Sequence, residues 1–249
     1  MIKLFRKIRY DLMEKNKTGK YFKYAIGEIV LVVIGIIIAL QINNWNENRK
    51  KLKEEQNIIF NLNAEFKNNL KQLNTTVLYM SKTIKGLDSI LQIMSKTISF
   101  DDKPESFDRL LNHTLEDPQF SPSSIVLKEL EGSGKLAILK NKKLKTLLYK
   151  WNLRIDATKV TEATNNKSYN DIFDYLKANA SLRRIDYSAK VVSSQTILSQ
   201  SNRHLLRDLK FENVLDDHYI LTSNRHRAYQ KLVKVINEII KQTESNSND

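Results

Sequence analysis

The sequence contains no cysteine and very few residues that break helices. Its 249 residues include only 6 glycines and 3 prolines. The lack of cysteine excludes disulfides, cysteine-ligated zinc and thiol catalysis. The scarcity of glycine and proline argues against a turn-rich β fold and favours long helices. The glycines form neither GxGxxG nor GxxxxGK[ST], so we expect no glycine-rich phosphate loop.

The chain is basic, with 41 Lys and Arg against 28 Asp and Glu and a formal net charge of +13. Residues 1–23 hold eight basic residues and two acidic ones. Within this leader, apolar residues recur at helical spacing among the lysines and arginines: Ile2, Phe5, Ile8 and Leu12. We predict a basic amphipathic leader that lies on anionic lipid headgroups on the cytoplasmic side. A polar tail beside the membrane is the alternative.

The run AIGEIVLVVIGIIIALQI, residues 25–42, is the strongest hydrophobic signal. At 1.5 Å per residue it spans about 27 Å as a helix, close to the hydrocarbon core of a bilayer. Aromatic residues flank it where a membrane interface is expected: Tyr21, Phe22, Tyr24 and Trp45. We therefore predict a transmembrane helix over residues 24–45. The alternatives are a cleaved signal peptide, which the sequence does not favour because no A-x-A site follows, and a buried core helix.

The orientation follows from the flanking basic residues. The N-terminal flank is strongly basic, whereas the basic residues after the run alternate with Glu47, Glu54 and Glu55. The positive-inside rule predicts a single-pass protein of the inner (cytoplasmic) membrane with a cytoplasmic N-terminus. The large helical domain, residues 46–242, is then periplasmic, and residues 243–249 form a disordered tail.

One face of the predicted membrane helix carries an ionisable residue and two small ones. Glu28 and Gly35 lie seven residues apart, about 20° on a helical wheel, and Ala39 falls on the same stripe. Such a face favours contact with a second copy of the chain or with another membrane protein. The alternative is that Glu28 extends to the nearby interface beside Lys20 and Lys23.

Two segments of the sequence are similar to a known family. They are AIGEIVLVVIGIIIALQINNWNE, with its basic leader, and SPSSIVLKELEGSGKLAILKNKKLKTLLYKW at residues 121–151. LKFENVLDDHYIL near the C-terminus fits more loosely. Together they resemble an uncharacterised domain-of-unknown-function family of membrane proteins from Bacteroidota. The resemblance implies a single-pass anchor with a helical envelope domain, and it brings no activity and no catalytic residues.

The domain after the anchor shows long apolar seams. Apolar residues from Ile59 to Ile98 recur at heptad-like steps, a second seam starts at Leu144, and a third runs from Leu215 to Ile240. Asn141 is a suitable N-cap for the second of these helices. One helix cannot bury such a seam alone, so we predict an all-α, elongated antiparallel bundle. Short helices within residues 104–140 form a cap or insert, one of them starting at Ser121 and Pro122.

The second seam has apolar ends and a polar middle: Thr158, Glu162 and Asn165. Two explanations are open. These residues line a polar pocket inside the bundle, or the helix extends past its partners into solvent.

No constellation of residues predicts chemistry. The four histidines form no metal motif, no serine lies in GxSxG, and we expect no catalytic residue, metal or cofactor. Lysines at 140–150 and basic residues at 225–234 could contact phosphates or form a solvated face, but a periplasmic domain is not expected to meet nucleic acid.

We therefore predict a non-catalytic envelope scaffold. Its partners are the lipid bilayer and a second copy or an envelope protein. One alternative is a ligand-sensing ectodomain, which would need a separate signalling partner because the leader is short. Another is a polyanion or nucleic-acid binder, if the orientation is reversed.

Overall fold

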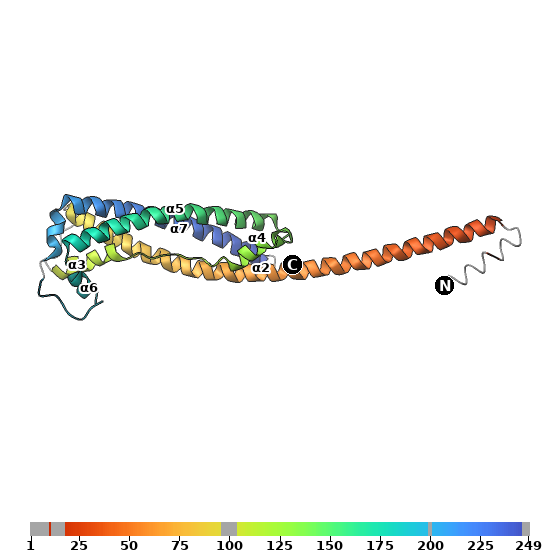
Figure 1. Ribbon diagram of the computed structural model, residues 1–249, viewed down its shortest axis with the longest axis horizontal. Helices are drawn as coiled ribbons and strands as arrows, with labels where there is room; N and C mark the ends of the chain where they lie inside the picture. Colours follow the sequence, from red (N-terminus) through yellow and green to blue (C-terminus); the bar gives the residue numbers. More distant parts are fainter. Residues whose placement is uncertain (1–9, 11–17, 96–103, 199–200, 246–249) are drawn as a thin grey trace. The chain divides into compact units, whose positions relative to one another are not determined.

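The computed structural model describes residues 10, 18–95, 104–198 and 201–245. It is 86% helical, with no strand in these ranges, which confirms the predicted all-α class. The elements are α2 (Thr18–Met94), α3 (Pro104–Asn112), η1 (His113–Leu115), α4 (Ile125–Gly132), η2 (Lys135–Ala137), α5 (Lys142–Asn179), α6 (Leu182–Ser188), η3 (Asn202–Arg207) and α7 (Leu209–Ser245) (Figure 1). The chain divides into two units, Met1–Asn57 and Ile58–Asp249.

The first unit is the N-terminal part of α2. From Phe22 to Ile42 the large apolar side chains are exposed within the protein, with Val33 at 47% and Phe22 at 66%. In the described residues, one helix is long and apolar enough to cross a membrane, and none of its most apolar window is buried. This exposure argues against a buried core helix, because a helix that is apolar all round needs an apolar environment. The predicted amphipathic leader lies outside the described residues, apart from Tyr10 and the first residues of α2.

The second unit is a bundle built on α2 from Ile58 onward, α5 and α7. Side chains of α2 meet α7 in antiparallel order, Asn63 with Thr243 and Ser81 with His226. Helix α5 also runs antiparallel to α7 and packs closely on it. Because both are antiparallel to α7, α2 and α5 point the same way, and they meet at the rings of Phe66 and Trp151.

Residues 104–141 return the chain from the end of α2 to the start of α5. They run back along α2, with Glu116 beside Thr83, Gln119 beside Thr76 and Ser123 beside Asn69. The prediction of a cap or insert is therefore wrong, because these residues form a fourth, partly irregular member of the bundle. The short helix starts at Ile125 rather than at Pro122, and residues 116–124 are not helical.

The ends of the helices agree with the sequence in one place and differ in another. Asn141 caps α5, accepting a hydrogen bond from the Leu144 N–H at 3.0 Å, as predicted. The predicted start of a disordered tail at residue 243 is wrong: α7 continues to Ser245. Thr243 is fully buried and accepts a hydrogen bond from Asn63, which extends the ordered helix beyond its last apolar seam residue. Residues 246–249 lie outside the described ranges.

The apolar core of the bundle has two parts. One contains Phe66, Trp151 and Ile236, and the other contains Leu87, Ile172 and Phe211. Between them the facing residues of α5 and α7 are polar: Asn165, Ser168, His218, Thr222 and Arg225, each at most 1% exposed. We call these five residues the polar layer. Its position matches the polar middle of the second seam.

Candidate functional site

Two polar residues of α2 hold the returning segment in place. The Glu65 carboxylate accepts hydrogen bonds from the Ser123 hydroxyl (2.6 Å) and from the backbone N–H groups of Val126 and Leu127. Ser124, the N-cap of α4, makes no capping bond with its side chain, so Glu65 takes that role from a neighbouring helix. One turn later, Asn69 pairs with both backbone groups of Ser123 at 2.8 Å.

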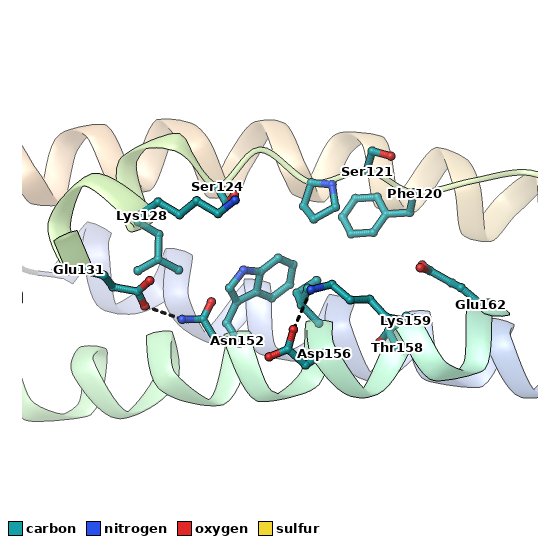
Figure 2. Close-up of a pocket in the computed structure, with 14 residues that line it drawn as sticks. Phe120, Ser121, Ser124, Lys128, Glu131, Asn152, Asp156, Thr158, Lys159 and Glu162 are labelled. Atoms are coloured by element: carbon teal, nitrogen blue, oxygen red, sulfur yellow. Dashed lines mark hydrogen bonds and ion pairs between the residues drawn. The ribbon is translucent and has the colours of Figure 1, made fainter.

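A groove of about 530 Å³ lies between this returning segment and α5 (Figure 2). Its base is apolar and well packed: the rings of Phe66 and Trp151 meet edge to face at 5.4 Å, and Phe120 packs on Tyr229 at 5.8 Å. Its rim is polar and carries both signs of charge: Lys128, Glu131, Asn152, Asp156, Lys159 and Glu162. A mixed polar rim over an apolar base is typical of a binding surface.

The rim side chains are partly paired with one another. Figure 2 shows Glu131 of α4 and Asn152 of α5 joined by a hydrogen bond across one end of the groove. On α5, Lys159 donates to Asp156 at 2.8 Å, and this hydrogen bond, with the charge of Asp156, raises the pKa of Lys159. Both side chains are largely exposed, so a ligand could replace this pairing at little cost.

The structure brings together two of the three polar seam residues. Thr158 and Glu162 line the groove, and Glu162 accepts a hydrogen bond from the Tyr229 hydroxyl at 2.7 Å. Burial, with this hydrogen bond, raises the pKa of Tyr229. Asn165 lies instead in the polar layer, where it donates to Thr222 at 2.9 Å. The explanation that α5 extends into solvent here is wrong, because Thr158 and Asn165 are buried against the bundle.

Some polar atoms of the polar layer form hydrogen bonds, and others are buried without a hydrogen-bond partner among the described residues. The Ser168 hydroxyl donates to the Asn165 carbonyl, so the His218 Nδ1 proton goes to the Ser168 oxygen at 3.0 Å. Within the described residues, His218 Nε2 then has no hydrogen-bond partner, and neither do Nε and Nη1 of Arg225. Burial lowers the pKa of His218 to about 4, so its ring is neutral at pH 7. Arg225 forms an ion pair with Asp117 of the returning segment.

A serine and a histidine also meet between α2 and α7. Ser81 Oγ lies 3.0 Å from Nε2 of His226, a pair that sequence inspection could not find because the residues are 145 positions apart. The Ser81 hydroxyl donates its proton to the Val77 carbonyl at 2.9 Å, so the ring nitrogen donates to Ser81. That direction is opposite to the proton transfer that a serine nucleophile requires. The pair therefore links two helices.

The predicted membrane residues all lie on α2. Phe22, Tyr24 and Trp45 are exposed, with Arg49 stacked 5.7 Å above the Trp45 ring, whereas the side chain of Tyr21 is outside the described part. On the predicted contact face, Ala39 is exposed and Glu28 is half-buried. A methyl group added at Gly35 would meet nothing within 4 Å. The contact face stays a prediction.

Part of the sequence matches a known protein family. Residues 28–155, just over half of the chain, match the model of a family of unknown function (DUF6090). The matched range holds most of the apolar run, the returning segment and α5 as far as Ile155. It therefore includes one wall of the groove and part of the other. No curated protein and no solved structure matches the chain. The chain belongs to the DUF6090 family of unknown function.

Proposed function

We propose that this protein is a single-pass, membrane-anchored scaffold of the cell envelope that binds another envelope component through its bundle and carries out no catalysis. The observation that supports it most is the exposure of the apolar side chains of α2 from Phe22 to Ile42. Such a surface is costly in water and favourable in lipid. The strongly basic leader favours a cytoplasmic N-terminus and a periplasmic bundle.

The lack of cysteine makes the orientation simple to test. Single cysteines replace Lys15 and Ser247, and intact spheroplasts of a bacterial host are treated with a membrane-impermeant maleimide. We expect Ser247→Cys to react and Lys15→Cys to react only after lysis. The reverse pattern would refute a periplasmic bundle and would make the nucleic-acid alternative the leading one. Extraction of the chain by alkaline carbonate would refute the membrane anchor itself.

The groove is the part of the bundle that we propose contacts the partner. Its rim offers Lys128 and Lys159 from two different elements, with Glu131 and Asp156 beside them (Figure 2). A photo-crosslinking amino acid at Lys159, which is largely exposed, should capture the partner in whole cells. The same amino acid at Lys234, an exposed residue outside the groove lining, is the control. Equal products from both positions would argue against the groove.

The dimensions of the groove support a second candidate, a ligand-sensing domain. A volume of about 530 Å³ falls within the range of small-molecule sites. For a sensor, a small molecule should raise the melting temperature of the full chain, and Lys159→Gln together with Asp156→Asn should remove that increase. A scaffold should respond to no small molecule and should lose its crosslinked partner in the same double variant.

A further inference from the structure

Helices α3 and α6 pack together (Figure 1). A second pocket, of about 730 Å³, is lined by residues of both helices and of the segment after α6. Three cationic side chains line it, Arg109 of α3, Arg183 of α6 and Lys190 just after α6. Tyr187, Ser188 and Ser193 add further polar residues to its lining. Within the described ranges no carboxylate lines it. These residues come from separate stretches of the chain, so no run of charge in the sequence indicates them.

The acidic residues nearest in sequence do not neutralise this pocket. Asp108 precedes Arg109, but its carboxylate is buried and bonds Arg184 at 3.0 Å and Asn202 at 2.8 Å. Asp186 lies on α6, half-buried, and is not part of the lining. The positive charge of the pocket is therefore available to an anionic ligand.

The backbone around the pocket is held in a defined conformation. The Arg183 guanidinium donates to the carbonyl and the hydroxyl of Ser194, at 2.9 and 2.7 Å. Val191 donates its N–H to the Asp186 carbonyl at 2.8 Å. Lys190 has a φ of 61°, and no other non-glycine residue in the described part has a positive φ. This conformation costs a lysine roughly 1 kcal/mol, and an asparagine or glycine would avoid most of that cost.

We propose that this pocket binds the phosphate group of an anionic phospholipid. Arginine forms paired hydrogen bonds with phosphate oxygens, and lysine adds a compact positive charge. Val191 and Val192 line the same pocket, and the Val191 side chain is 69% exposed. Exposed apolar residues beside clustered cations match a headgroup at the edge of a lipid surface. The strain at Lys190 is then explained by the charge that it places in the pocket.

The test uses the full chain in nanodiscs of phosphatidylcholine, mixed with vesicles of phosphatidylcholine alone or with phosphatidylglycerol. We expect the wild type to sediment with the anionic vesicles only. The triple variant Arg109→Gln, Arg183→Gln, Lys190→Asn should bind them at least about tenfold more weakly, a loss of one or more charge-assisted hydrogen bonds. The matched control replaces by glutamine three exposed lysines that lie outside the pocket and outside both basic clusters: Lys71, Lys167 and Lys241.

Equal losses in the two triple variants would overturn the proposal, because they would show that only total charge matters. Retained binding in the pocket variant would overturn it as well. Two single variants separate charge from folding. Lys190→Asn fits the positive φ and should keep or raise the melting temperature while weakening binding. Lys190→Arg should bind like the wild type.

Inorganic phosphate distinguishes the two sources of the ligand group. If the lipid is the ligand, millimolar phosphate should compete only weakly with the anionic vesicles, because the apolar contacts belong to the lipid. The opposite result is that phosphate alone raises the melting temperature of the wild type but not of the triple variant, and that vesicles do not bind. That result would refute the lipid assignment and would identify the pocket as a site for small phosphates.

Discussion

Gly86 of α2 lies directly against the ring of His113, so close that a methyl group at Gly86 would come within 2.4 Å of the ring carbons. The contact joins α2 to the end of the α3–η1 segment, next to the hydrogen bond from Thr83 to Glu116. A glycine inside a helix normally lowers its stability relative to alanine, so this one is explained by the close packing.

We expect Gly86→Ala to lower the free energy of unfolding by about 1–3 kcal/mol, because the histidine ring must move out of a packed position. Urea denaturation of the full chain in detergent measures it. Gly132→Ala is the control, since a methyl group there meets nothing within 4 Å. Adding His113→Ala should recover part of the loss, and no recovery would show that the ring contact is not the cause.

Glu65→Gln should release the start of α4 from α2. The carboxylate accepts three hydrogen bonds, two of them from backbone N–H groups in the first turn of α4. We expect a loss of about 1–3 kcal/mol and faster proteolysis within residues 116–124. Glu244→Gln, which breaks only an exposed ion pair with Lys67, should cost less than about 1 kcal/mol. Equal effects of the two changes would contradict the capping role.

Stability should fall as the pH drops from 6.5 toward 4, because of His218. Burial lowers its pKa from 6.5 to about 4, with Asp117 and Arg225 as the charged groups that act on it. Above pH 6.5 the ring is neutral in both the folded and the unfolded chain, and the full stability is present. Between 6.5 and 4 the unfolded chain takes up the proton and the folded chain does not, which costs up to about 3 kcal/mol.

The measurement compares urea unfolding of the wild type and of His218→Gln at several pH values in that window. The difference between the two curves isolates His218 from the half-buried His226, whose pKa burial also lowers. A constant difference from pH 7 to 4 would show that His218 does not titrate as described.

Gly35→Ile tests the predicted contact face of the membrane helix. A large side chain at Gly35 should prevent close approach of a second helix and should reduce crosslinking of the chain in membranes. Gly27→Ile, about 80° around the helix from Gly35, should have little effect. A Cβ added at either glycine meets nothing within 4 Å in the described part of the chain, so we expect little effect on folding. Unchanged crosslinking in Gly35→Ile would refute the contact face.

Much of the fold could be predicted from local patterns. The seams that contain Phe66, Leu144 and Ile236 predicted the long helices, and Asn141 predicted the start of α5, because cap and seam depend on neighbours within a few residues. The candidate groove was only partly predictable. Thr158 and Glu162 were identified as polar seam residues, but the opposite wall, from Phe120 to Glu131, docks through Glu65 and Asn69. No local pattern pairs residues more than 50 positions apart.

By itself the sequence determined that the chain is helical, that residues 25–42 form an apolar helix, and that the second seam changes from apolar to polar and back. Composition and periodicity act over a few turns, and these properties need no partner. Only the tertiary structure decided that α2 and α5 run in the same direction, with the returning segment beside α2. It also placed Arg109 in the same pocket as Lys190, and Asp117 against Arg225. Those contacts depend on which apolar faces pack together. The pairing of those faces depends on packing over the whole core and not on neighbours in the sequence.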